Sequence, residues 1–154
     1  MAVVATYSHQ FMLECLRAQH QIDTGVASPD TLKIILMGSA FAFDPDTHST
    51  YATVSASEIA AGTGTGYTVG GETLTNVLTT IDTSADQVDI AADNITWTAT
   101  GGAILTTGSA IVYNDSHANK TVVMCIDFGA DYDTATDKLF QVNFSAGFGV
   151  VDNA

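Results

Sequence analysis

Basic side chains are nearly absent from this chain. It has 4 lysine and arginine residues against 17 aspartate and glutamate residues among 154, so its formal net charge is −13. Four cations cannot build a surface that neutralises phosphate groups, and a strongly acidic protein repels a polyanion. The composition therefore argues against nucleic acid as a partner, and it disfavours an anionic membrane surface for the same reason.

Cysteine is scarce as well. The chain has 2 cysteines, Cys15 and Cys125, which lie far apart in the sequence. A disulfide between them remains open, but two thiols in a chain of this size are more typical of small buried apolar residues. They therefore do not indicate a redox compartment. A chain of this length buries most of its apolar surface without disulfides or metals.

We also expect no targeting signal in the N-terminal residues, because no basic region and no apolar core lead to a small-residue cleavage site. The longest uncharged stretch, Asn94–Asn114, reaches the 21 residues of a membrane span. It contains three glycines, and its apolar residues alternate with polar ones. This pattern predicts a buried or half-buried β-hairpin rather than a spanning helix.

A helical pattern is confined to the N-terminal part of the chain. Apolar residues recur at i, i+4 spacing over Tyr7–His20, and Thr6 or Ser8 is suited to cap the start. We therefore divide the chain into a helical arm, residues 1–30, and a β domain, residues 31–154. The arm holds more apolar surface than a lone surface helix leaves in water, so it either reaches a partner subunit or packs across its own sandwich.

From residue 31 onward the pattern is that of an antiparallel β protein. The dense apolar run in Thr31–Phe43 predicts a buried strand, Tyr51–Val54 a short strand and Ala56–Ala61 a helical turn. Turn-forming residues separate the further predicted strands, which are Leu74–Thr80, a short strand with Val88 and Ile90, Ile95–Thr100, Ala103–Tyr113, Thr121–Phe128 and Leu139–Val151. Gly129–Asp137 is predicted to be a turn. The sequence thus predicts a mainly β fold, a single antiparallel sandwich or barrel of jelly-roll type with one N-terminal helix.

The single tryptophan lies in the middle of an alternating strand. Ile95, Trp97 and Ala99 alternate with threonines. We expect Trp97 to be buried and to contribute more to the core than any other side chain.

Local motifs predict no catalytic, cofactor or metal site. The glycine-rich segment Gly62–Gly71 lacks the GxGxxG spacing and the lysine of a phosphate-binding loop. Asp44, Asp46 and His48 begin like a calcium loop, but the glycine and the glutamate that such a loop requires are missing. Asp131 and Asp133 form an acidic pair with no further ligands that the sequence can place.

Histidines and serines add no catalytic pattern. The four histidines, His9, His20, His48 and His117, lack metal-ligand spacing, and the glycine-flanked serines, Ser39, Ser109 and Ser145, lie outside a GxSxG motif. We therefore predict that the chain is not an enzyme. A glycan hydrolase is the minor alternative, but it needs a carboxylate pair that no sequence pattern selects.

Threonine-lined strands, abundant alanine and glycine, and a low density of charge are typical of a chain that buries surface against partners. The composition therefore favours a subunit of an assembly over an independent enzyme. Carboxylates are concentrated in the predicted loops.

Four segments in order resemble a known group of proteins. They are Gly66-Tyr67-Thr68-Val69-Gly70-Gly71-Glu72-Thr73-Leu74, Asp93–Ala99, Ala110–Asn114 and Ile126–Gly129, preceded by Leu32–Met37, Phe43, Asp44, Asp46 and His48. Over most of residues 31–151, the sequence resembles small virion proteins of tailed bacteriophages that are encoded among the head and tail structural genes. That group has no catalytic residues to carry over.

The resemblance implies a structural role in the virion, assembled in the bacterial cytoplasm. A capsid decoration or cement protein would bind the major capsid protein on the outside of the head shell as a homo-oligomer, most often a trimer. Its negative charge suits the exterior, away from packaged DNA. A tail, baseplate or fibre-associated protein is the alternative placement, with tail proteins as partners.

Overall fold

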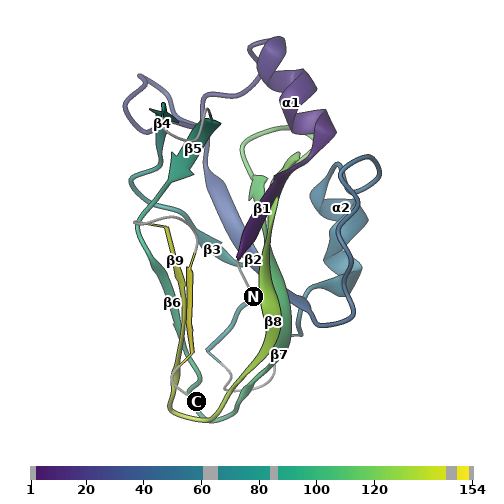
Figure 1. The fold of residues 1–154 in the computed structure, drawn as a ribbon, viewed down its shortest axis with the longest axis vertical. Coiled ribbons are helices and arrows are strands. Elements are labelled where there is room, and N and C mark those ends of the chain that lie inside the picture. The colour runs from purple at the N-terminus through teal and green to yellow at the C-terminus, as the bar shows by residue number, and fades with distance from the viewer. Residues whose placement is uncertain (1–2, 61–65, 84–86, 145–148, 153–154) are drawn as a thin grey trace.

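Two antiparallel sheets face each other across an apolar core in the computed structural model, which describes residues 3–60, 66–83, 87–144 and 149–152 (Figure 1). The larger sheet has the order β1 (Val4–Tyr7), β8 (Val122–Thr134), β7 (Ile104–Asn114), β2 (Leu32–Gly38) and β3 (Glu72–Thr73). The smaller sheet has the order β10 (Gly149–Asp152), β9 (Leu139–Asn143) and β6 (Ile95–Thr98). The prediction of a mainly β, antiparallel, sandwich-like fold is confirmed.

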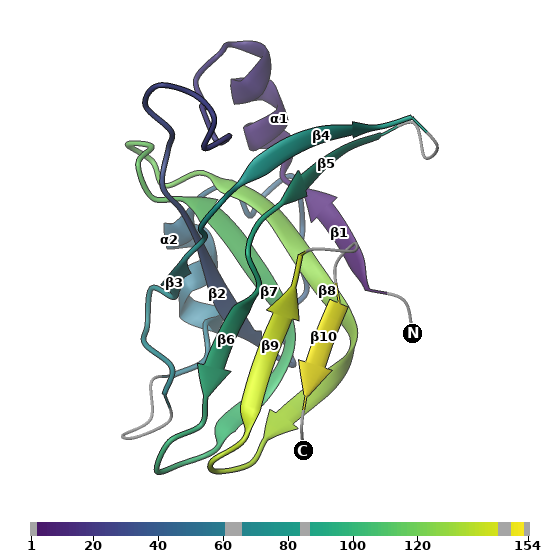
Figure 2. The same ribbon diagram turned by 90° about the vertical axis from the view of Figure 1, so that its left-hand side faces the viewer.

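The remaining elements lie around the sandwich. A separate hairpin pairs β4 (Leu78–Asp82) with β5 (Gln87–Ala91), and the helices are α1 (His9–Leu16), α2 (Tyr51–Val54) and the 3₁₀ turn η1 (Ser55–Ser57). Figures 1 and 2 both place α1 and the β4–β5 hairpin at the same end of the molecule. In Figure 1, α2 lies on the opposite side of the larger sheet from β6 and β9.

Both faces of the larger sheet are buried. Towards the smaller sheet, the core contains Leu36, Val112 and Ile126 of the larger sheet together with Trp97 and Phe140 of the smaller one. A second apolar cluster lies on the other face and combines Ile35, Met37, Ile111, Tyr113, Val122 and Cys125 with Val54 of α2. Burial on both sides explains why β2 has a continuous apolar run instead of an alternating pattern.

The N-terminal segment is built into the larger sheet. Val4–Tyr7 forms β1 and pairs with β8, so the predicted helix Tyr7–His20 is shorter than expected and begins only after Ser8. The Ser8 hydroxyl accepts a hydrogen bond from the Phe11 N–H and caps α1. The helix ends at Leu16, and the chain then turns through Ala18, which has a φ of 55°.

Further boundaries differ from the sequence predictions. The single strand predicted over Leu139–Val151 is two strands, β9 and β10, which pair with each other in antiparallel fashion. Tyr51–Val54 is helical rather than extended because Thr50 and Thr53 form a capping box. The strand predicted over Leu74–Thr80 begins only at Leu78, after Asn76 with its φ of 51°. In place of a turn from Gly129, β8 continues to Thr134, since Gly129 with a φ of 72° forms part of an irregular pairing.

The segment Asn94–Asn114 contains two strands, as expected, but they do not form a hairpin. β6 pairs with β9 in the smaller sheet, whereas β7 pairs with β2 and β8 in the larger sheet. The intervening glycines therefore carry the chain from one sheet to the other. A periodicity of two predicts a strand and does not identify its partner.

Cys15 and Cys125 are both free thiols, and Cys125 is buried as predicted while Cys15 is exposed. Burial raises the pKa of the Cys125 thiol to about 12. Among the residues that the structure describes, no helix combines the length and the apolar character needed to cross a membrane.

Candidate functional site

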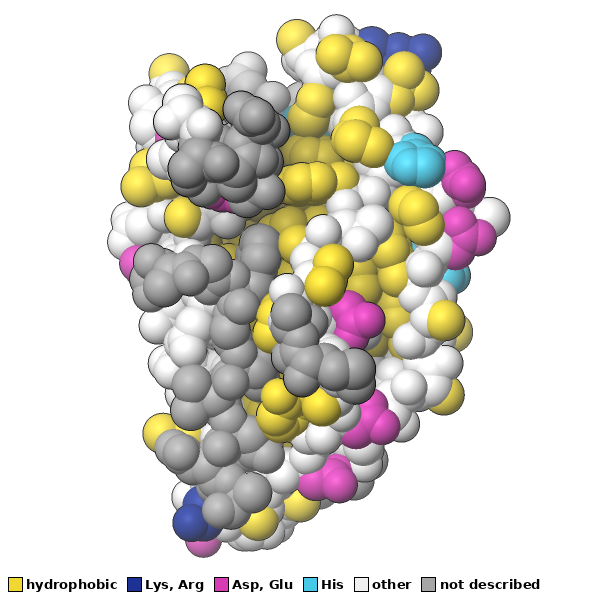
Figure 3. Space-filling model, viewed as in Figure 1, with side chains coloured by type: hydrophobic (Ala, Val, Ile, Leu, Met, Phe, Trp, Pro, Cys, Tyr) yellow, Lys and Arg dark blue, Asp and Glu magenta, His cyan; other side chains and the backbone are white. Residues whose placement is uncertain are grey.

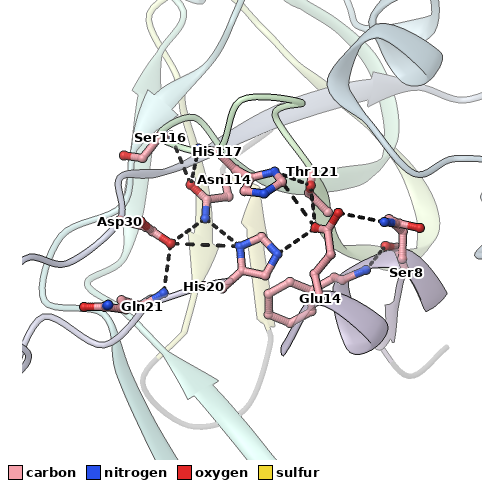
Figure 4. A network of polar contacts seen from close by, with 11 residues as sticks. Ser8, Glu14, His20, Gln21, Asp30, Asn114, Ser116, His117 and Thr121 are labelled. Carbon is pink, nitrogen blue, oxygen red and sulfur yellow. Dashed lines mark hydrogen bonds and ion pairs between the residues drawn. The ribbon is translucent and has the colours of Figure 1, made fainter. Parts of the chain in front are cut away.

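A buried polar network joins α1 to the large sheet at the end of the molecule where the helix lies (Figure 4). Its centre is Glu14 of α1, which is close to His20 in the loop after the helix and to His117 in the β7–β8 loop. The side chains of Glu14 and His20 are 4% and 1% exposed. One potential ligand atom from each of the three residues lies within 4.8 Å of the others, a spacing at which a metal ion could bind if each atom had a free lone pair.

The Glu14 carboxylate already accepts hydrogen bonds from three side chains. The Gln10 amide donates to its Oε1 over 2.7 Å, while His20 Nε2 and the Thr121 hydroxyl both lie 2.8 Å from its Oε2. Burial alone would raise the pKa of Glu14, but these hydrogen bonds, together with the nearby His117, lower it. The carboxylate is therefore the stable form in the folded protein.

Neighbouring donors determine where the His20 proton lies. The Asn114 Oδ1 accepts the backbone N–H groups of Ser116 and His117, which orients the Asn114 amide so that its Nδ2 donates to His20 Nδ1 over 2.9 Å. The second proton of this Nδ2 goes to Asp30 Oδ2 over 2.7 Å. His20 therefore carries its proton on Nε2, where it donates to Glu14.

The position of the proton on His117 also follows from its hydrogen-bond partner. Because the Thr121 hydroxyl donates to Glu14, it accepts the proton of His117 Nδ1 over 2.8 Å. The atoms nearest to Glu14 on both histidines are thus N–H groups, without the free lone pair that a metal ion needs. The hydrogen bonds fit a structural network that ties α1 to β7 and β8 better than they fit a metal centre.

The GYTxGG segment forms a second polar centre, around Glu58. The Tyr67 hydroxyl and the Gly70 N–H both donate to Glu58 Oε1 over 2.7 Å, and the Tyr51 hydroxyl donates to Oε2 over 2.9 Å. The Tyr67 oxygen also accepts the Leu36 N–H, which connects the loop to β2. Burial and the Glu58 carboxylate together raise the pKa of Tyr51 to about 12.

Two glycines of this segment are required by close backbone contacts. A Cβ on Gly66 would lie 1.8 Å from the Thr98 carbonyl oxygen, and one on Gly71 would lie 1.9 Å from the Ile34 carbonyl oxygen. Both residues also have φ values near +70°, which glycine adopts without strain. The motif therefore anchors the loop to both sheets, and no phosphate site is needed to explain it.

Glu58→Gln is expected to lower the free energy of unfolding by about 1–2 kcal/mol, because two tyrosine hydroxyls and an N–H lose a charged acceptor. It should also lower the pKa of Tyr51 from about 12 toward its ordinary value, since the Glu58 charge contributes to the shift. Urea denaturation and a spectrophotometric tyrosine titration measure the two effects. Glu72→Gln, at an exposed glutamate of β3, is the matched control and should change neither. An unchanged tyrosine titration in Glu58→Gln would contradict this account.

A cleft lies on the face of the larger sheet that carries α2. Its volume is about 650 Å³, and its lining includes Ser39, Phe41, Phe43, Ser109, Asp127 and Asp131; we call it the outer cleft. The floor is formed by β7 and β8, and the loop that follows β2 forms one wall. No local motif predicts this cleft, because its residues come from four separate segments, of which β1 contributes Thr6. Asp127 and Gly129, however, belong to the Ile126–Gly129 segment noted above.

The acidic residues and serines of the remaining sequence motifs lie in turns, in β8 and in the outer cleft. Asp44 accepts bonds from the Asp46 N–H and the Thr47 hydroxyl, so its carboxylate caps its own turn. Asp133 accepts from the Thr106 hydroxyl. Ser39 and Ser109 both line the outer cleft, whereas Ser145 lies outside the described residues.

Comparisons of the chain with protein-family models, with curated proteins and with solved structures found no match.

Proposed function

We propose that this chain is a structural protein of a tailed-bacteriophage virion that binds the outside of the head shell as a homo-oligomer. The ordered sequence segments described above support this role. The sandwich-like fold is compatible with it, and a net charge of −13 suits a surface that faces away from packaged DNA.

The observation that carries the proposal is the gathering of exposed apolar side chains at one end of the molecule. α1 exposes Met12, Leu13 and Leu16, and the β4–β5 hairpin exposes Ile81 and Val88; we call these five residues the apolar end. Leu16 is 88% exposed and Ile81 is 77% exposed. Ile81 and Val88 are direct partners in the hairpin and so share one face.

The surroundings of these residues also favour a protein partner. In Figure 3, apolar side chains line the hollow between the hairpin and α1. The Tyr7 hydroxyl donates to the Val88 carbonyl oxygen over 3.3 Å, which connects the hairpin to β1. Apolar surface gathered in this way is typical of interaction sites. A large protein surface, such as a capsid shell or further copies of the chain, would bury it.

The test is co-sedimentation of the purified protein with head shells from which it has been removed, followed by a count of bound copies. Saturable binding with hundreds of copies per particle is the expected result for a decoration protein. Binding to tails in small multiples of three or six would instead favour the tail placement. Absence of binding to either structure would overturn the proposal.

Replacement of the apolar end should abolish this binding without unfolding the protein. Leu16→Glu combined with Ile81→Glu places two charges where the partner needs apolar contact. Stability should change by no more than about 0.5 kcal/mol, because both side chains are exposed. The control, Leu139→Glu combined with Val69→Glu, adds the same charge at exposed apolar residues outside the apolar end and should bind normally. Equal loss of binding in both pairs would show that added charge, rather than the apolar end, is responsible.

A further inference from the structure

Strand β1 ends the larger sheet, and no described strand lies on its outer edge (Figure 2). The Ser8 N–H donates to a carbonyl oxygen of β8 over 3.0 Å. Hydrogen-bonded pairs alternate along an antiparallel ladder, so Thr6 and Val4 also exchange hydrogen bonds with β8. The N–H and C=O groups of Ala5 and Tyr7, which lie between them, therefore point away from the sheet.

These outward main-chain groups are unpaired. Within the described part of the chain, no residue forms a hydrogen bond with the main-chain N–H or C=O of Ala5 or Tyr7. The sequence of β1 also contains no proline and no charged side chain, and its pairing with β8 has no bulge. These are the features that usually protect an edge strand from pairing with another chain. The outer edge of β1 is therefore a template for a further strand.

The two faces of β1 differ in their surroundings. Ala5 and Tyr7 pack against the core, and the Tyr7 hydroxyl reaches the Val88 carbonyl oxygen of the hairpin. This face continues into the apolar hollow between the hairpin and α1 (Figure 3). Val4 and Thr6 point to the opposite face, where Val4 is 53% exposed. An added strand would place alternate side chains on these two faces.

The exposed surface beside β1 is acidic. Asp127 is the ladder partner of Val4, and Asp131 and Asp133 follow it on β8; all three are exposed. Within the described segments, no lysine, arginine or histidine nitrogen lies within 4.0 Å of these carboxylates. A strand on the outer edge of β1 would lie about 10 Å from Asp127, which is two strand spacings. An extended lysine or arginine side chain can span that distance.

We propose that the outer edge of β1 binds an extended segment of a partner protein in which apolar and basic side chains alternate. The segment adds as an antiparallel strand, which continues the pattern of the larger sheet. Its apolar side chains lie beside Ala5 and Tyr7 and pack towards the hollow. Its basic side chains cross Val4, cover it with their aliphatic stems and reach Asp127.

Main-chain hydrogen bonds supply the affinity of such a strand, and the alternating side chains supply its specificity. A second copy of the chain fits this edge less well, because two paired β1 strands would bring two rows of β8 carboxylates together. The proposal does not rest on the virion role, since it follows from the edge and its charges alone.

The probe is the peptide acetyl-Lys-Val-Lys-Val-Lys-Val-amide, titrated into the full-length protein while backbone amides are followed by NMR. Saturable shifts are expected at Ala5 and Tyr7. Hydrogen exchange of these two amides should slow about tenfold or more, because each gains an acceptor. The Thr6 amide already pairs with β8, so its exchange should change little. Unchanged exchange at Ala5 and Tyr7 with saturating peptide would overturn the proposal.

Two matched peptides separate the contributions of backbone and charge. N-methylation of the valines removes the N–H groups that face β1 and should weaken binding about tenfold or more. Replacement of the lysines by glutamates keeps the valines and the backbone but reverses the charge, and it should weaken binding by a similar factor. If either control peptide binds as tightly as the lysine peptide, the proposal is wrong.

A pair of variants locates the binding on β1. Ala5→Pro removes an N–H that β8 does not use, and proline is tolerated at such edge positions. It should weaken peptide binding about tenfold or more, whereas Ala5→Val adds similar bulk, keeps the N–H and should bind normally. Equal binding by the two variants would contradict the assignment. If Ala5→Pro does not fold, the N-methylated peptide decides the question on the wild-type protein.

Sedimentation of the same proteins tests the alternative occupant. A wild-type dimer that Ala5→Pro converts to a monomer would overturn the proposal, because a second copy would then occupy the edge. The result is also separable from the particle assay. A protein that binds the lysine peptide but neither heads nor tails would overturn the virion role and leave the β1 assignment in place. A protein that decorates heads but binds the lysine and N-methylated peptides equally would do the reverse.

Discussion

Trp97→Ala is expected to lower the free energy of unfolding by about 3–5 kcal/mol, the usual range for removing a large aromatic side chain from a core. Trp97 is 2% exposed and lies on β6, where its side chain faces the larger sheet. Its ring is 6.0 Å from both the Tyr67 and the Phe140 rings, so it connects the GYTxGG loop to the smaller sheet. Its removal would therefore leave a cavity between the two sheets.

Trp97→Phe provides the matched control. The indole Nε1 is buried and has no hydrogen-bond partner among the described residues, so losing this N–H leaves no other group unpaired. Phenylalanine retains most of the apolar contact, and the expected loss is about 1 kcal/mol. Chemical denaturation followed by circular dichroism compares the three proteins. A loss in Trp97→Phe as large as that in Trp97→Ala would contradict the packing argument, as would wild-type fluorescence typical of an indole in water.

The fold class and the position of the core were predictable because they depend on periodicity along the chain. Trp97 is buried, and the strands over residues 95–98, 104–114 and 122–128 occur where alternation or a dense apolar run placed them. The boundaries that differed are controlled by local chemistry that periodicity does not report. Thr50 and Thr53 cap a helix in place of a strand, and positive φ values at Asn76 and Gly129 shift the strand limits.

Strand pairing and the two polar centres were not predictable from one sequence. β6 and β7 are neighbours along the chain but belong to different sheets. Glu14 and Thr121 are 107 positions apart, and no spacing rule joins them. The one available signal was the GYTxGG segment, whose Tyr67 and Gly70 are now explained by Glu58. The outer cleft depends on an irregular pairing between β7 and β8, which only the three-dimensional register reveals.

Glu14 joins α1 to the sheet through side-chain hydrogen bonds, in addition to the backbone pairing of β1 with β8. Its carboxylate accepts hydrogen bonds from Gln10 on its own helix, from His20 in the following loop and from Thr121, which immediately precedes β8. Met12, Leu13 and Leu16 on the same helix remain exposed. α1 therefore contributes both a buried polar anchor and an apolar surface. The two interpretations of the N-terminal arm, packing on its own sandwich and contact with a partner, are compatible in this arrangement.

Glu14→Ala is accordingly expected to lower the free energy of unfolding by about 2–5 kcal/mol, because it leaves two buried neutral donors, on His20 and Thr121, without an acceptor. Glu14→Gln keeps an acceptor oxygen and should therefore lower the free energy of unfolding by less than Glu14→Ala does.

The pH dependence of stability distinguishes this hydrogen-bond network from simple packing. The pKa of Glu14 is lower in the folded protein than in the unfolded chain, where it is about 4.3. The Glu14 carboxylate therefore contributes its full stabilisation above that unfolded pKa. This contribution disappears as the pH falls through the lower pKa of the folded protein. Denaturation curves of wild type and Glu14→Gln should therefore differ near neutral pH and converge in acid. A difference that stays constant down to about pH 3 would show that the charge of Glu14 is not what stabilises the fold.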